Sequence, residues 1–321
     1  MRHLLLLLMP LWVMAFGADL IASDLPIAAR VDGRLYLLPC LTRPAALRDF
    51  DQQELAQRAT WLLGTPIPYG PFASQFAGLQ LSLAPPSATH LLGTDDRGRD
   101  VAARLVHGAR TAVAIGVAAV ALYLAIGLLV GLAAAVHPRI DWLLGRLIEL
   151  GLTFPTFFLL LAIQGAWGSS SLIEVAIAVA LVRWPEVARL VRASARQAAQ
   201  SPHVEAARAL GVGPARLAWH HILPAAASPA ITAAAFGIGQ AVLIETGLTY
   251  LGFGVPPPVA SWGELLSQAQ GAGLAWWLVV PPMVAIAGTV WLCQRAAEAI
   301  RHTSRPSSLE ACATRIPEGL T

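Results

Sequence analysis

The chain has 321 residues, of which 56% are hydrophobic and only 13% are charged, and its formal net charge is +3. Its mean hydropathy is +0.61. Soluble domains carry charge at about a quarter of their positions because their surfaces face water, so this composition excludes an ordinary soluble protein.

The basic side chains are 22 arginines and no lysine. This excludes a phosphate-binding P-loop and Schiff-base catalysis, since both need a lysine. No HExxH or GxSxG motif occurs, so an intramembrane enzyme is the least favoured class. Cys40, Cys293 and Cys312 lie far apart and match no metal or disulfide spacing, so we expect three free thiols.

Apolar runs of close to 20 residues recur along the chain, and runs of this length cross a bilayer as helices. They predict an all-α polytopic membrane protein with six transmembrane helices, at residues 4–21, 111–136, 148–166, 172–182, 225–248 and 275–292. The apolar part of the fourth span is short. We therefore expect this helix to continue past Arg183, whose long side chain can reach the membrane surface.

The first span, within residues 1–22, has two interpretations. A short basic start, a leucine run and Ala15-Phe16-Gly17 are compatible with a cleaved signal peptide. The apolar stretch continues to Ile21, however, and is longer than the roughly 7–15 residues of a usual signal-peptide core. We therefore expect a retained transmembrane helix.

The long polar segment before the second span is the candidate for a small subdomain. Asp32-Gly33 between residues 27–31 and 34–38 predicts a β-hairpin. Residues 49–63 have the composition of a short polar helix. Residues 101–112 place apolar side chains on one helical face, which predicts a helix at the outer membrane surface.

The arginine distribution predicts the orientation, because short cytoplasmic loops collect positive charge. The loops after the second and fourth spans and the segment after the sixth contain arginines, whereas residues 168–171 and 250–273 contain none. Both termini are therefore expected in the cytoplasm. Long loops translocate largely regardless of charge, so an arginine-containing outer segment is no contradiction. The predicted parts are residues 1–22 (first helix), 23–110 (outer segment), 111–300 (core of five helices, with a cytoplasmic loop at 184–224) and 301–321 (cytoplasmic tail).

The largest cytoplasmic loop predicts two short helices. Ser201 suits an N-cap, Pro202 suits the first helical position, and Glu205 is favourable near the positive end of the helix dipole. Gly211 can adopt the left-handed conformation that ends a helix. A second short helix follows and is expected to stop before Pro224.

This loop resembles the EAA loop of ABC importer permeases, because Glu205-Ala206-Ala207, Gly211 and Leu223-Pro224 fall at the spacing of that motif. The resemblance implies a type I ABC importer permease architecture. It also implies that the first short helix is the coupling helix, seated in a cleft of a cytoplasmic ATPase subunit. An ordinary amphipathic loop at the membrane surface is the alternative. The residues that the resemblance assigns to ATPase coupling are Glu205, Ala206, Ala207, Gly211, Leu223 and Pro224.

Two further stretches resemble the C-type subunit of oligopeptide and dipeptide permeases. One precedes the second span and begins His90-Leu91-Leu92-Gly93-Thr94-Asp95. The other follows the fifth span and begins Leu251-Gly252-Phe253-Gly254-Val255. Residues 19–38 are more loosely similar to the peptide permeases associated with microcin uptake. For single residues of the first stretch, a hydrogen-bonded polar turn without a ligand is the preferred interpretation.

Glu245 is predicted near the outer end of the fifth span. A carboxylate is costly there and indicates either a function in the pore or a hydrogen bond to a neighbouring helix. Both interpretations stay open. His220-His221 have no third ligand nearby, so no metal site is expected. Gly127 and Gly131 have a small-xxx-small spacing, which permits close contact between helices.

The resemblance implies a permease subunit of an ATP-driven, binding-protein-dependent importer in the bacterial inner membrane, with peptides as the expected solute. Its expected partners are a second homologous permease, cytoplasmic ABC ATPase subunits and an extracytoplasmic substrate-binding protein. Catalytic activity, a cofactor and nucleic-acid binding are not expected. Permeases for nickel, opines or glycopeptides remain alternatives. A self-sufficient secondary transporter or channel is the alternative from another class, but we find no internal repeat of the kind such folds use.

Overall fold

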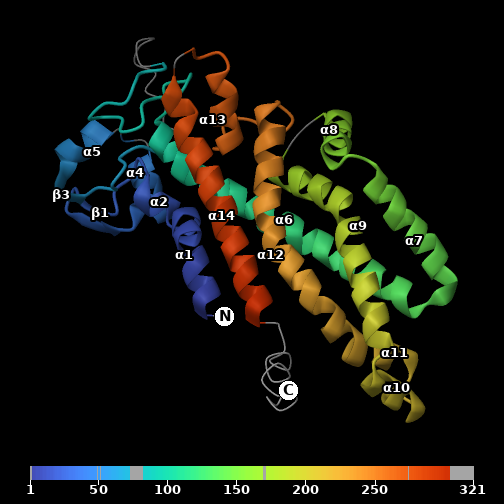
Figure 1. Ribbon diagram of the computed structural model, residues 1–321. Coiled ribbons are helices and arrows are strands. Elements are labelled where there is room, and N and C mark those ends of the chain that lie inside the picture. Colours follow the sequence, from blue (N-terminus) through green and yellow to red (C-terminus); the bar gives the residue numbers. More distant parts are fainter. Residues whose placement is uncertain are drawn as a thin grey trace, which may run out of the picture.

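The computed structural model describes residues 2–48, 50, 52–72, 82–168, 171–273 and 275–303. Four long helices dominate it, with a small subdomain at one end and a pair of short helices at the opposite end (Figure 1). The long helices are α6 (Val101–Val136), α9 (Leu172–Ala199), α12 (Leu223–Tyr250) and α14 (Val280–Thr303). The shorter ones are α1 (Arg2–Phe16), α2 (Ala18–Ile21), α3 (Pro39–Thr42), α4 (Ala45–Arg48), α5 (Gln52–Arg58), α7 (Pro138–Thr153), α8 (Thr156–Trp167), α10 (Pro202–Ala209), α11 (Pro214–Leu217) and α13 (Trp262–Ala269), with a π-helical turn at Ala218–Ile222 and a 3₁₀ turn at Trp276–Leu278.

Two glycines bring α6 and α9 into close contact. A Cβ atom at Gly127 would lie 2.6 Å from the Cβ of Val187, and one at Gly131 would lie 2.5 Å from the carbonyl oxygen of Ala188. The small-xxx-small spacing therefore belongs to a contact within this chain. α12 packs against both helices and against α14. Two apolar clusters lie between α6, α9 and α12, and a further one joins α6, α12 and α14.

α6 is longer than the predicted second span. The side chain of Asp100 accepts a hydrogen bond from the backbone N–H of Ala103 at 2.8 Å and caps the helix. The helix then runs unbroken to Val136, about 54 Å at 1.5 Å per residue. The expected helix at the outer membrane surface is thus no separate element, because its residues form the first turns of α6.

The predicted third span, residues 148–166, is not one straight helix. α7 and α8 meet at an angle of 90°. A residue before proline is disfavoured in the α region, and Phe154, which precedes Pro155, is extended with ψ of 136°. The proline therefore ends α7, and α8 starts in a new direction. The pair forms a broken span or a re-entrant loop.

The second short helix of the EAA-like loop does not stop before Pro224, so that prediction is wrong. α11 continues through the π-helical turn into α12, and the backbone is helical from Pro214 to Tyr250. Proline has no N–H, and its ring clashes with the carbonyl four residues earlier in a regular helix. A widened π-helical turn just before Pro224 accommodates it without ending the helix.

The fourth and sixth spans are also longer than their apolar stretches. α9 begins with a capping box between Ser171 and Glu174 and continues past Arg183, as the sequence predicts. α14 follows the 3₁₀ turn and extends through Thr303, beyond the predicted end of the sixth span. Of the predicted tail, residues 304–321 lie outside the described part of the chain.

Length and composition alone do not identify six membrane-spanning helices among the described residues. Three helical segments of the described residues are long and apolar enough to cross a membrane, Val101–Val136, Pro214–Tyr250 and Trp276–Arg301. The bent pair α7–α8 adds a fourth if it counts as one span. α1 has only 15 residues, and the second half of α9 carries several charged side chains.

Residues 22–67 form the small subdomain. Its antiparallel sheet has the strand order β2-β1-β3, with β1 at Ala28–Val31, β2 at Arg34–Leu37 and β3 at Ala59–Leu63. β1 and β2 form the predicted hairpin, and Asp32 and Gly33 in its turn both have positive φ, as a two-residue type I′ turn requires. Residues 49–63 are not one helix, because α5 ends at Arg58 and β3 follows.

Candidate functional site

α10 protrudes together with α11 at the end of the molecule opposite to the sheet (Figure 1). Ser201 occupies the N-cap position, Pro202 the first helical position, and Glu205 the first turn, as the sequence predicts. The buried side chain of Val204 packs into a cluster that contains Leu217. This anchor fixes α10 on the end of the long helices and leaves most of its surface exposed.

α10 ends in a Schellman motif, which explains the glycine at this position. The N–H of Gly211 donates to the carbonyl oxygen of Arg208 at 3.0 Å, and the N–H of Val212 donates to that of Ala207 at 3.2 Å. Gly211 has φ of +83°, in the left-handed region that glycine adopts without strain. Just before it, Leu210 is 86% exposed. The described part of the chain therefore leaves this apolar side chain uncovered, where another molecule can contact it.

The residues that the EAA resemblance assigns to coupling fall into two groups. Ala207 and Leu223 pack against the same apolar cluster as Val204. The exposed ones are Glu205, Ala206, Gly211 and Pro224. The two packed residues therefore hold α10 against the long helices, and the four exposed residues are available to another molecule.

Glu245 lies on α12 and is only 1% exposed. Its Oε1 accepts hydrogen bonds from the hydroxyls of Thr249, at 2.9 Å, and Ser261, at 2.8 Å. Ser261 is also the N-cap of α13 and accepts a hydrogen bond from the N–H of Gly263 at 3.1 Å. This geometry corresponds to the second of the two interpretations of Glu245, a hydrogen bond to a neighbouring element.

A buried network of charges lies near the start of α6. Arg99 Nε donates to Asp95 Oδ2 at 2.6 Å, and its Nη2 donates to Glu264 Oε1 at 2.9 Å. Arg104 Nη2 donates to the other oxygen of Glu264, and its Nε lies 3.6 Å from Asp95 Oδ2. None of the four side chains is more than 8% exposed. Two positive and two negative charges compensate each other here, as buried charges require.

The network joins segments that are far apart in the sequence. The guanidinium of Arg104 also donates to the carbonyl oxygens of Pro71, at 2.9 Å, and Val259, at 3.1 Å. Burial alone would lower the pKa of Arg99, but the carboxylates of Asp95 and Glu264 outweigh it and raise that pKa. Arg99 therefore stays charged inside the protein.

Two tryptophans complete this unit. Trp262 Nε1 donates to the carbonyl oxygen of Leu105 at 2.9 Å, and Trp277 Nε1 donates to that of Thr94 at 3.1 Å. A Cβ atom at Gly108 would lie 2.7 Å from Cδ1 of Trp262, so glycine permits this approach. The two stretches that resemble the peptide permeases, before the second span and after the fifth, are thus one packed unit.

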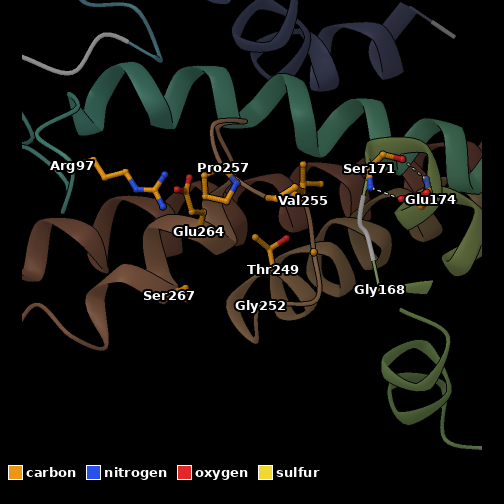
Figure 2. Close-up of a pocket in the computed structure, with 12 residues that line it drawn as sticks. Arg97, Gly168, Ser171, Glu174, Thr249, Gly252, Val255, Pro257, Glu264 and Ser267 are labelled. Carbon is orange, nitrogen blue, oxygen red and sulfur yellow. Dashed lines mark hydrogen bonds between the residues drawn. The ribbon is translucent and has the colours of Figure 1, made fainter. Parts of the chain in front are cut away.

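A pocket of about 680 Å³ opens beside the network. Figure 2 shows Arg97 and Glu264 toward one end of it and Ser171 and Glu174 toward the other. The carboxylate of Glu174 accepts a hydrogen bond from the backbone N–H of Ser171 at 2.6 Å. The pocket therefore carries an exposed positive side chain, Arg97, opposite a fixed negative one.

Sequence reasoning missed this network. Its preferred interpretation, a polar turn satisfied within itself, holds for the contacts of Asp95 with the N–H groups of Arg97 and Arg99, both at 2.9 Å. It misses the partner, Glu264, which follows 160 residues after Arg104. One signal was available in the sequence. These charged residues lie next to predicted membrane spans, where little water is present, so they need partners of opposite charge.

Metal-binding side chains do not gather in the described ranges, where no group of three or more His, Cys, Asp or Glu is placed to hold an ion. His220 and His221 lie on the π-helical turn. Cys40 and Cys293 are buried free thiols, and Cys312 lies outside the described residues.

Residues 124–300 match the family model of the binding-protein-dependent transport system inner membrane component. The match covers more than half of the chain and includes α10 with its EAA-like motif. The chain belongs to this family. It is therefore a multi-pass inner-membrane permease component, and the predicted family is confirmed.

Named relatives agree with this assignment. The permease is 37% identical over 209 residues to a putative peptide transport system permease protein of Brucella suis. The alignment covers 65% of this chain and 70% of the relative. The permease is 36% identical over 247 residues to the di/tripeptide transport system permease protein of Pseudomonas aeruginosa, covering 74% and 80%. A structure of the MetNI methionine ABC transporter in inward-facing conformations aligns with a TM-score of 0.54 and 19% identity, covering 63% of this chain and 97% of that one. The last similarity concerns the fold alone.

Proposed function

We propose that this permease carries peptides across the inner membrane and that α10 is its coupling helix. The observation that carries the coupling role is the exposed tip of α10, where Leu210 is 86% exposed beside the EAA-like motif. The names of the relatives from Brucella suis and Pseudomonas aeruginosa, which are peptide and di/tripeptide permeases, support the solute class.

The coupling role follows from how α10 is attached. α10 follows α9 after a two-residue turn, and α11 continues through the π-helical turn into α12. A displacement of α10 is therefore passed to two long helices at once. ATP hydrolysis belongs to separate ATPase subunits in this proposal, and an ATPase cleft that holds Leu210 would move the ends of both helices.

The proposed topology has six spans with both termini in the cytoplasm. α1 with α2, and α9, are the two spans that length and composition alone do not identify. α1 packs against α6 and α14, which supports its place in the same membrane layer. The arginines at the α10 end support a cytoplasmic position for that end. The subdomain and the buried charge network then lie on the outer side.

The pocket beside Arg97 and Glu174 is the proposed outer part of the solute path. Its opposite charges suit the carboxylate and ammonium ends of a peptide. A second homologous permease completes the pore in this proposal, and an extracytoplasmic substrate-binding protein delivers the peptide to the outer face.

Transport by the assembled complex tests the proposal. Proteoliposomes hold this permease, its partner permease, the ATPases and the binding protein, and uptake of labelled dipeptides is compared with uptake of nickel. Peptide uptake that depends on ATP and on the binding protein is the expected result. Uptake that needs neither ATP nor the ATPases would instead support a self-sufficient transporter, and uptake of nickel but no peptide would overturn the solute class.

A further inference from the structure

The sheet of the small subdomain has two apolar faces, and only one of them is covered. Ala29, Val31 and Tyr36 point to the side where Cys40 and Leu55 form a buried cluster. The opposite face carries two rows of side chains across the three strands. The pairing of the strands defines these rows as Leu37–Ala28–Leu63 and Leu35–Arg30–Trp61.

The four large side chains of this second face are strongly exposed. Leu35 is 60% exposed, Leu37 67%, Trp61 52% and Leu63 49%. An antiparallel sheet with one face in water normally carries polar side chains on that face. An exposed apolar face of this kind on a small subdomain indicates a surface that lipid or another molecule covers.

Hydrogen bonds hold the subdomain at a defined height along α6. Ala22 and Ile67 form a bridge where the chain enters and leaves the subdomain, and His107 Nε2 lies 2.8 Å from the carbonyl oxygen of Ala22. His107 lies four residues before Thr111, where the predicted apolar run begins, which is about 6 Å along a helix. The bridge is thus at the level of the lipid headgroups if α6 crosses the membrane as proposed.

The sheet starts six residues after this bridge, and its uncovered face is turned away from the helices of the subdomain. In Figure 1 the strands lie below α5, on the side toward which α1 continues to its N-terminal end. The covered face meets Cys40 of α3, Leu47 of α4 and Leu55 of α5, so the uncovered face is turned away from these helices.

The chemistry of the face matches a lipid surface. Leucines bind the outer part of the acyl chains, and tryptophan is enriched at the boundary between acyl chains and headgroups. Arg30 lies in the middle of the face, between Leu35 and Trp61, and it is exposed. Its long side chain can bury its methylene groups among them and bring the guanidinium to a lipid phosphate.

We propose that this face, formed by Leu35, Leu37, Trp61 and Leu63 around Arg30, rests on the outer leaflet of the membrane. The subdomain is then a monotopic anchor that lies in the lipid interface beside the bundle. This inference rests on the membrane placement given under the proposed function. The occupant is lipid, and no second protein is needed to cover the face.

The depth of single spin labels in lipid nanodiscs tests this inference. The full chain is assembled with its partner subunits, Cys40, Cys293 and Cys312 are replaced by alanine, and one label is attached at Leu37→Cys. Accessibility to oxygen and to a water-soluble nickel chelate gives the depth of the label. We expect it about 5–10 Å below the phosphates, as for an interfacial anchor. Glu54→Cys on the exposed side of α5 is the matched control and should be fully accessible to the chelate.

Two results would overturn the lipid contact. Equal chelate accessibility at Leu37 and Glu54 would place the face in water. Protection of Leu37 that appears only after the substrate-binding protein is added would assign the face to that protein. A third label at Val284→Cys, on the exposed side of α14, separates this inference from the proposed function. If Val284 is deep in the lipid while Leu37 is in water, the anchor alone is wrong, and if Val284 is also in water, the membrane placement is wrong.

Discussion

Arg104 has its whole side chain buried, with 0% exposure, and shares Glu264 with Arg99. We expect Arg104→Met to keep the shape of the side chain but leave Asp95 and Glu264 short of one positive charge. Breaking a buried pair by removing one partner costs about 3–5 kcal/mol. The apparent unfolding midpoint of the purified protein in denaturant should fall accordingly.

Arg97→Met is the matched control for this change. Arg97 is half exposed and lies 3.9 Å from Asp96, and exposed pairs contribute about 0–1 kcal/mol. Its unfolding midpoint should stay close to that of the unmodified protein. Equal midpoints for both variants would show that the buried network does not stabilise the fold.

Gly211 offers a second test at the scale of one residue. We expect Gly211→Val to strain the end of α10 by about 1–2 kcal/mol, because a β-branched side chain is placed at a φ of +83°. α11 should change direction, and peptide-stimulated ATP hydrolysis by the assembled complex should fall. Insertion into the membrane should be unaffected.

Gly213→Val separates backbone strain from bulk at the same turn. Neither Gly211 nor Gly213 has an atom within 4 Å of an added Cβ, but Gly213 has φ of −62°. The complex assembled with this variant should hydrolyse ATP at close to the unmodified rate. If Gly211→Val behaved the same way, the left-handed end of α10 would have no role in coupling.

The roles of single residues were predicted correctly where those roles depend only on neighbouring residues in the sequence. Ser201, Pro202 and Gly211 act at the ends of α10 as expected, since caps depend on a few neighbouring residues. The pairing of Arg104 with Glu264 was not predicted, because it depends on how segments 160 residues apart come together. For Glu245, a hydrogen bond to a neighbouring helix was one of two interpretations, but its donor Ser261, 16 residues later, was not predicted.

At the scale of elements, the contact between α6 and α9 depends on two missing side chains. We expect Gly131→Val to force these helices apart, since its Cβ would lie 2.5 Å from the carbonyl oxygen of Ala188 and 2.8 Å from the Cβ of Val191. Overpacking of this kind costs about 1–3 kcal/mol. The yield of folded protein after detergent extraction and gel filtration should fall.

Gly288→Val on α14 is the control for helix propensity. A Cβ at Gly288 has no neighbour within 4 Å, so the same change adds no clash within the chain. Its folded yield should stay near the unmodified level. If both variants lost the same folded yield, the loss would come from replacing a helical glycine by valine and not from the α6–α9 contact.

Proline was the main source of error in predicting the elements. Pro155 turns the chain by 90° between α7 and α8, whereas Pro224 is absorbed in a π-helical turn and Pro185 lies inside α9. The local rule is the same at all three positions, and the packing around each decides between a bend, a widened turn and a continuous helix. β3 was missed because α5 and β3 follow each other without a loop.

At the scale of the whole molecule, the composition and the apolar runs predicted the helical membrane class, and the family model confirms the family. The orientation remains a prediction. A reporter that is active only outside the cytoplasm should be active when fused near Pro71 or Pro257, and silent near Arg196 or Arg301. The short loops at the α10 end contain arginines, whereas residues 168–171 and 250–273 contain none. Activity at Arg196 would contradict the six-span topology.

Cys40 is buried with 0% exposure in the core of the small subdomain, and burial raises the pKa of its thiol. Disulfide exchange needs an accessible thiolate, and Cys40 is neither accessible nor easily ionised. The subdomain is therefore held by its apolar cluster, with its one thiol kept out of reach of oxidants. If the subdomain lies on the oxidising side of the membrane, as proposed, it can mature without help from thiol oxidoreductases and should keep its structure whatever the surrounding redox state.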